Sequence, residues 1–168
     1  EVTDVLNPSP ESYTVEMWFY ASSDDEFQRI LDKVVNQDIN QPGFQVSYND
    51  FGPFPANLHY QEVKSDGNFH GLMTGNQTVP SGSWFHYALV RTANGLARRF
   101  LNGESLGATQ FNQDAFMVDQ SNATPLWIGC EDFSAQFFQG RIDELRISAG
   151  ERYSTSFDVK DVGFETDG

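Results

Sequence analysis

The chain has 168 residues, of which 39% are hydrophobic and 14% aromatic, so it is long and apolar enough to bury a sizeable core. Its 24 acidic and 10 basic residues give a formal net charge of −14, which argues against binding to nucleic acid or anionic membranes. Such a charge attracts cations, but it is equally typical of an extracellular or high-salt protein. Cys130 is the only cysteine, which excludes an internal disulfide, and no apolar run reaches the roughly 20 residues of a membrane-spanning helix. We therefore expect one domain over residues 1–168 and no membrane insertion.

Apolar and polar residues alternate in short runs along the chain, which is typical of β-strands. The first run, Tyr13–Tyr20, places Val15, Met17 and Phe19 on one face. Residues 27–35 fit a short helix or a strand, and we favour the strand. Further strands are predicted at Phe44–Tyr48, Leu58–Val63, Trp84–Thr92, Leu96–Leu101, Ser105–Thr109, Leu126–Ile128 and Arg141–Ser148. About a dozen short strands with frequent turns, and no convincing long helix, predict a β-sandwich.

Two local patterns predict specific contacts. Asn102-Gly103 lies between two predicted strands and is typical of a two-residue hairpin turn. Beyond the last strand, Tyr153 and Phe157 are expected to anchor the C-terminal tail by packing. His86 lies inside a strand, so we expect a hydrogen-bonded structural role rather than metal binding.

Glu16 and Arg146 both alternate out of phase with apolar neighbours in their strands. We therefore expect them on the non-core faces of two strands that neighbour each other in one sheet. A cross-strand pair of this kind stabilises a sheet by about 0.2–1 kcal/mol.

The segment Leu126–Ser148 contains two strands joined by a polar and aromatic loop. In the second strand, strict alternation places Asp143 on the same face as Leu145 and Ile147, and Ile142 on the opposite face. A carboxylate on an apolar face needs a cation, a metal or several N–H donors. This conflict between charge and pattern is the most informative local feature of the sequence.

Five segments, in this order, resemble the laminin-G-like domains: Y-T-V-E-M-W-F-Y, W-F-H-Y-A-L-V-R, R-R-F-L-N-G-E, L-W-I-G and G-R-I-D-E-L-R-I-S. The resemblance covers roughly residues 12–150. It implies an all-β, concanavalin A-like jelly-roll sandwich of two antiparallel sheets with little or no helix. It also implies ligands on the concave face or at its loop rim, and frequent calcium.

Catalysis is not indicated. The glucanases that are similar to laminin-G-like domains hydrolyse sugars with two carboxylates in an E-x-D-x-x-E pattern, which is missing here. The acidic pairs Glu131-Asp132 and Asp143-Glu144 are adjacent, so in extended chain their members point to opposite faces. The three histidines lack the spacing of a zinc site. We therefore expect that the protein is not an enzyme.

Calcium is the expected cofactor because Asp-rich and Asn-rich loops supply its oxygen ligands. The resemblance implies that Asp143 takes the place of a carboxylate that holds structural calcium in similar glucanases. Glu131 and Asp132 take the place of calcium carboxylates in pentraxins, near the ligand rim. The alternatives are a carboxylate satisfied by backbone N–H groups for Asp143 and a solvated loop for Glu131 and Asp132.

Sugar binding needs an exposed aromatic platform beside amide or carboxylate hydrogen-bonding groups. Two segments of the sequence have this composition, and the alternative for both is that the aromatic side chains only pin loops onto the core. The candidate carbohydrate-binding residues are Tyr48, Asn49, Asp50 and Phe51 in the first, and Asp132, Phe133 and Gln136 in the second, whose cluster also includes Phe138.

The leading hypothesis is a non-catalytic, lectin-like carbohydrate-binding module of a larger extracellular, adhesin, virion or phage-fibre protein. Its partner would be a glycan or a cell-surface polysaccharide. The alternative is a structural or adhesive module that contacts a protein and binds no sugar. The sequence does not specify the sugar, the parent protein or the oligomeric state.

Overall fold

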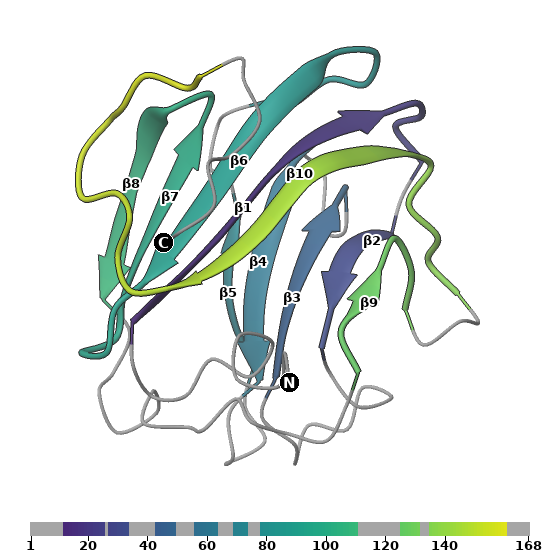
Figure 1. Cartoon of the computed structure of the whole chain (residues 1–168). Coiled ribbons are helices and arrows are strands. Elements are labelled where there is room, and N and C mark those ends of the chain that lie inside the picture. The colour runs from purple at the N-terminus through teal and green to yellow at the C-terminus, as the bar shows by residue number, and fades with distance from the viewer. Residues whose placement is uncertain are drawn as a thin grey trace.

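The computed structural model describes residues 12–25, 27–33, 43–49, 56–63, 69–73, 78–110, 125–131 and 135–160. These residues form two antiparallel sheets that face each other, and the described part of the chain contains no helix (Figure 1). Sheet A has the strand order β10-β1-β6-β7-β8, and sheet B has the order β5-β4-β3-β2-β9. The strands are β1 (Tyr13–Ala21), β2 (Gln28–Asp32), β3 (Gly43–Tyr48), β4 (Leu58–Val63), β5 (Phe69–Met73), β6 (Trp84–Arg91), β7 (Leu96–Leu101), β8 (Glu104–Gln110), β9 (Trp127–Ile128) and β10 (Gly140–Ala149). The predicted all-β sandwich is confirmed.

The core lies between the two sheets, and the alternation of β1 explains how it is filled. Val15, Met17 and Phe19 are completely buried, as their shared face predicts. From sheet B, Phe44 and Val46 meet them across the sandwich. No segment in the described ranges is a helix long and apolar enough to cross a membrane.

Two elements differ from the strand predictions. The strand that we favour for residues 27–35 is present as Gln28–Asp32, and residues 34 and 35 lie outside the described residues. β5 at Phe69–Met73 was not predicted, because F-H-G-L-M contains a glycine and lacks the period-two alternation that identifies a half-buried strand. It forms the edge of sheet B by pairing with β4.

The hairpin between β7 and β8 is confirmed. Leu101 pairs with Glu104, so Asn102 and Gly103 are the two turn residues. Their φ angles of +50° and +78° are both in the left-handed region that a type I′ turn requires. The turn is joined to the C-terminal segment, because the backbone N–H of Phe157 donates to the carbonyl of Gly103 at 3.0 Å.

A β-bulge in β10 overturns the predicted faces of that strand. Glu16 pairs with Arg146 but Trp18 pairs with Asp143, so β10 has one residue more than β1 between these two pairs. The extra residue, Glu144, has a φ of +51°. A bulge of this kind shifts the alternation of every residue on its far side.

The prediction that Asp143 shares the apolar face of β10 was therefore wrong. Ile142 packs against the core together with Leu145 and Ile147, whereas Asp143 is exposed. Its Oδ1 accepts a hydrogen bond from the backbone N–H of Glu144 at 2.9 Å. The burial argument for a structural calcium at Asp143 no longer holds, and calcium itself stays a prediction.

The predicted pair of Glu16 and Arg146 is confirmed on the outward face of sheet A. Oε1 of Glu16 accepts hydrogen bonds from Nη2 and Nε of Arg146 at 2.7 and 2.9 Å, and Nε of Arg152 lies 3.3 Å away. Oε2 accepts a hydrogen bond from the Tyr153 hydroxyl at 2.7 Å, and Nε2 of His86 lies 3.4 Å from it. The expected structural role of His86 is thus confirmed. Burial pushes the pKa of Glu16 upward, but these partners outweigh it and hold the pKa below its ordinary value.

The C-terminal segment after β10 covers part of this outward face (Figure 1, yellow). Tyr153 and Phe157 stack on each other, with ring centroids 3.6 Å apart, and pack on a small second cluster. The cluster consists of Ala88, Val90 and Phe100. The prediction that Tyr153 and Phe157 anchor the tail is confirmed.

Candidate ligand-binding site

The two predicted sugar-binding segments lie on either side of the first residues of β2. The backbone N–H of Phe27 donates to the carbonyl of Asn49 at 3.0 Å, and the N–H of Arg29 donates to the carbonyl of Gln136 at 2.8 Å. Both segments therefore lie at the same end of sheet B, so they could contribute to one ligand site at the loop rim. The other predicted residues Asp50, Phe51, Asp132 and Phe133 lie outside the described residues.

Tyr48 was predicted as an exposed sugar platform, and that prediction was wrong. Its ring is completely buried, because it shares the inward face of β3 with Phe44 and Val46. Its hydroxyl lies 2.7 Å from Oδ1 of Asp24 and 2.8 Å from the carbonyl of Val79. Burial and the Asp24 carboxylate raise the pKa of Tyr48, so the phenol stays a neutral core residue.

Asn49 has a structural role at the end of β3. Its φ is +53°, a conformation that asparagine tolerates better than most residues, and it is 8% exposed. The side-chain Nδ2 donates to the carbonyl of Asp24 at 2.6 Å, and Oδ1 accepts from the N–H of Ala56 at 3.1 Å. Both ends of the amide are thus engaged within the protein.

The residues that the rim offers to a ligand are Phe27, Phe137 and Gln136. Phe27 is 46% exposed and Phe137 is 57% exposed. Gln136 has a φ of +51°, and its buried Oε1 has no hydrogen-bond partner among the described residues. Phe137 forms a β-bridge to Arg29, which holds it beside β2. We call Phe27, Gln136 and Phe137 the rim site.

Sequence reasoning missed both exposed phenylalanines, although the Phe137-Phe138 pair carries a signal. Phe138 packs against Phe19 and Tyr48 with centroid distances of 6.5 Å in each case. Because neighbours in an extended chain point to opposite sides, burial of Phe138 directs Phe137 outward. Phe27 has a φ of +61° and gives no comparable pattern.

Glu131 lies between β9 and the rim site and is 7% exposed. It forms an antiparallel bridge with Ala135, with N–H···O distances of 3.1 and 3.4 Å. No group of three or more metal-ligating side chains occurs within the described ranges. A calcium ion held by Glu131 and Asp132 stays a prediction.

The outward face of sheet B is polar, in contrast to its inward face. The residues that alternate with the core positions of β2, β3 and β4 include Arg29, Asp32, Gln45, Ser47, His59 and Gln61. All six are less than 9% exposed. Nε of Arg29 lies 3.6 Å from the Asp32 carboxylate. Their hydrogen-bonding groups suit a sugar, but their burial makes them less accessible to a ligand than Phe27 and Phe137 of the rim site.

A family model described as "Concanavalin A-like lectin/glucanases superfamily" matches residues 1–155, and it is a laminin-G-like model. The chain belongs to this superfamily. A search of curated proteins finds no match. The laminin-G-like resemblance and the concanavalin A-like sandwich are therefore both confirmed.

Several solved structures share this superfamily fold at low sequence identity. The CBM40 of the Ruminococcus gnavus IT-sialidase aligns with a TM-score of 0.66 and 17% identity, over 86% of this chain and 79% of that chain. The binding domain of Paraclostridial Mosquitocidal Protein 1 has a TM-score of 0.66 and 16% identity, over 88% of this chain and 36% of that chain. Domains LG4-5 of the mouse laminin α1 chain have a TM-score of 0.61 and 11% identity, over 84% and 36% of the two chains. The last two are much longer than this concanavalin A-like chain.

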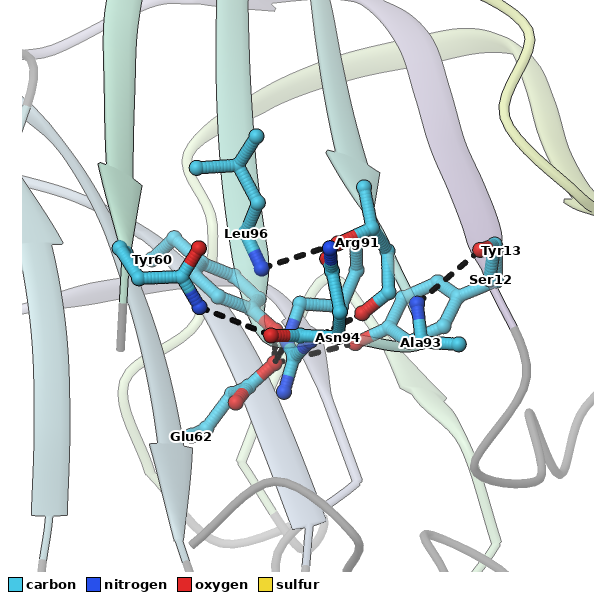
Figure 2. A network of polar contacts seen from close by, with 10 residues as sticks. Ser12, Tyr13, Tyr60, Glu62, Arg91, Ala93, Asn94 and Leu96 are labelled. Carbon is cyan, nitrogen blue, oxygen red and sulfur yellow. Dashed lines mark hydrogen bonds and ion pairs between the residues drawn. The ribbon is translucent and has the colours of Figure 1, made fainter. Parts of the chain in front are cut away.

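A second buried acidic network of this superfamily member lies inside the sandwich, at Glu62 (Figure 2). Nε of Arg91 donates to Oε1 of Glu62 at 2.8 Å, and the hydroxyls of Tyr13 and Tyr60 also hydrogen-bond to Oε1. A glucanase needs a second carboxylate beside the first to act on a glycosidic bond. Within the described residues Glu62 contacts two phenols and a guanidinium, so this network links β1, β4 and β6.

Proposed function

We propose that this chain is a non-catalytic carbohydrate-binding module whose glycan contacts the rim site. The observation that supports the proposal is the pair of exposed rings, Phe27 and Phe137, on either side of β2 and next to the half-buried Gln136. Aromatic faces pack against the C–H faces of a sugar, and an amide oxygen accepts a hydrogen bond from a hydroxyl.

Superfamily membership and the structural neighbours are consistent with this proposal. The CBM40 of the Ruminococcus gnavus enzyme was solved with α2,3 sialyllactose and with α2,6 sialyllactose. By analogy, the partner of this chain is a glycan or a cell-surface polysaccharide. The chain would then act outside the cell, at a cell surface or on a virion, as one part of a larger protein.

A glycan array tests the proposal. We expect the wild-type chain to retain at least one class of glycan, and Phe137→Ala to lose that binding without a change in melting temperature, because the ring is exposed. Ile128→Ala is the matched control, since Ile128 is 53% exposed on β9 and is not part of the rim site. Silence of the wild-type chain across the array would refute carbohydrate binding.

Calcium belongs to the same experiment. We propose that Glu131 and Asp132 hold a calcium ion that assists the rim site. Chelator should then weaken retention on the array, and isothermal titration calorimetry should detect calcium uptake that Glu131→Gln abolishes. Asp143→Asn should leave that uptake unchanged, because Asp143 is exposed on the other sheet. Absence of calcium uptake by the wild-type chain would end this part of the proposal.

A protein-contact module is the second candidate function. Phenylalanine is more common at protein contacts than as a sugar platform, and the laminin α1 domains share the fold. If the array is silent and a protein partner is captured from an extracellular fraction by the wild-type chain but not by Phe137→Ala, this second function replaces the first.

A further inference from the structure

The outward face of sheet A carries an aromatic surface that differs from the rim site. Tyr20 on β1 and Trp84 on β6 are directly paired, and their ring centroids are 5.7 Å apart. Trp18 lies two residues before Tyr20 and therefore on the same face. Trp84 is 41% exposed, and the other two rings are half-buried. We call Trp18, Tyr20 and Trp84 the aromatic platform.

β10 borders the platform with one cation and one anion. Arg141 pairs with Tyr20, and Asp143 pairs with Trp18. The guanidinium carbon of Arg141 lies 5.7 Å from the centroid of the Tyr20 ring. Arg141 and Asp143 are both exposed, and neither forms an ion pair within the described part of the chain. An exposed donor group and an exposed acceptor group thus flank the rings, although Oδ1 of Asp143 already accepts the backbone N–H of Glu144.

The C-terminal segment, as far as residue 160, covers the neighbouring part of the same face, and none of its ring contacts within the described residues involves the platform. Its Phe157 ring lies edge-on to His86 at 5.8 Å and packs on Phe100 at 5.4 Å. His86 is paired with Trp18, so the covered area ends where the platform begins. The platform is therefore not the docking place of residues 150–160.

The chemistry of the platform fits a neutral pyranose. The C–H face of the sugar ring packs on an aromatic face, and each hydroxyl both donates and accepts hydrogen bonds. Arg141 supplies donors and Asp143 supplies acceptors for one set of hydroxyls. A carboxylate-bearing sugar would instead meet Asp143 and a chain with a net charge of −14.

We propose that the aromatic platform, with Arg141 and Asp143, is a second glycan site that binds neutral hexopyranose oligosaccharides. It is carried by sheet A, whereas the rim site is carried by the end of sheet B. The proposal shares with the proposed function only the chemical class of the ligand, and it rests on a different set of residues.

Isothermal titration calorimetry with defined hexasaccharides tests the second site. The probes are hexasaccharides of glucose, mannose and galactose as the neutral panel, and hexagalacturonic acid as the charged comparison. We expect at least one neutral hexasaccharide to bind. Trp84→Ala should weaken that binding at least about tenfold through loss of the stacking surface, and Arg141→Ala about fivefold through loss of hydrogen bonds.

The controls separate this site from the rim site and from misfolding. Arg141 is exposed, so its alanine variant should keep the wild-type melting temperature even if Trp84→Ala does not. Phe137→Ala and Ile128→Ala should bind the neutral probe as the wild-type chain does. The proposal is overturned if no neutral hexasaccharide binds, if only the charged probe binds, or if Phe137→Ala abolishes neutral binding while Trp84→Ala and Arg141→Ala retain it. In each of these cases the glycan array with Phe137→Ala still decides the rim site on its own.

Discussion

At the scale of single residues, Glu16 has four side-chain partners on the outward face of sheet A. Its carboxylate is completely buried, yet it contacts Arg146, Arg152, Tyr153 and His86. A buried carboxylate is tolerated when its lone pairs are satisfied in this way. The residue therefore links β1 and β10 to the C-terminal segment, and removing its charge leaves two guanidinium groups without their shared anion.

We predict that Glu16→Gln lowers the free energy of unfolding by about 2–3 kcal/mol. This loss is smaller than the loss on breaking a fully buried ion pair, because Arg146 and Arg152 both keep some contact with water. The pKa of Glu16 is lower in the folded protein than its ordinary value of 4.5. This stabilisation is therefore fully present above pH 4.5 and is lost as the pH falls through the folded pKa. Urea unfolding across this pH range should show a shallower acid slope in Glu16→Gln, whereas Glu104→Gln, an exposed control, should follow the wild type. Equal acid slopes in Glu16→Gln and the wild type would contradict the prediction.

At the scale of elements, the β-bulge in β10 determines which side chains of that strand face the core. Glu144 adopts a φ of +51° that costs a residue with a Cβ atom roughly 1–2 kcal/mol and that glycine adopts freely. We predict that Glu144→Gly raises the free energy of unfolding by about 0.5–1 kcal/mol, because part of the gain is offset by backbone entropy. Glu104→Gly, also an exposed glutamate in a strand of sheet A but without a positive φ, should lower it. Thermal unfolding of both variants checks the difference, and a loss of stability in Glu144→Gly would argue against the bulge.

The hairpin turn and the C-terminal segment are coupled through Gly103. A Cβ atom at Gly103 would lie 2.0 Å from the carbonyl oxygen of Phe157, whereas at Gly129, which has the same φ of +78°, it would meet nothing within 4 Å. We predict that Gly129→Ala costs only the left-handed strain of about 1–2 kcal/mol, and that Gly103→Ala costs more. Limited proteolysis should cut after residue 150 faster in Gly103→Ala than in Gly129→Ala. Identical cleavage of the two variants would show that the segment does not depend on this contact.

At the scale of the whole molecule, the net charge of −14 works against the compact state through self-repulsion. We predict that the melting temperature rises as sodium chloride is raised from about 0.01 M to 0.15 M, because the Debye length falls from about 30 to 8 Å. Calcium chloride at matched ionic strength separates this screening from specific binding, since a bound ion adds stability beyond the common curve. A melting temperature that falls with sodium chloride would show that attractive ion pairs, such as those of Glu16, outweigh the repulsion.

Local sequence signals determined the sandwich, most of its strands and several of its contacts. The alternation of Tyr13–Tyr20 fixes which side chains of β1 enter the core, because one face of the strand is buried. Asn102-Gly103 predicts its turn without tertiary information, because asparagine and glycine both adopt the positive φ angles that a type I′ turn requires. The pair of Glu16 and Arg146 could be predicted because each residue lies between apolar residues in its strand and therefore points away from the core.

Only the tertiary structure decided the faces of β10 and the identity of the exposed aromatic rings. The bulge at Glu144 is set by pairing with β1, so strict alternation placed Asp143 on the wrong face. Tyr48 and Phe137 are both aromatic residues of predicted ligand-binding segments, but the packing of the opposite sheet buries one and leaves the other exposed. Alternation gives the spacing of side chains along one strand, whereas access to solvent depends on which distant strand packs against each face.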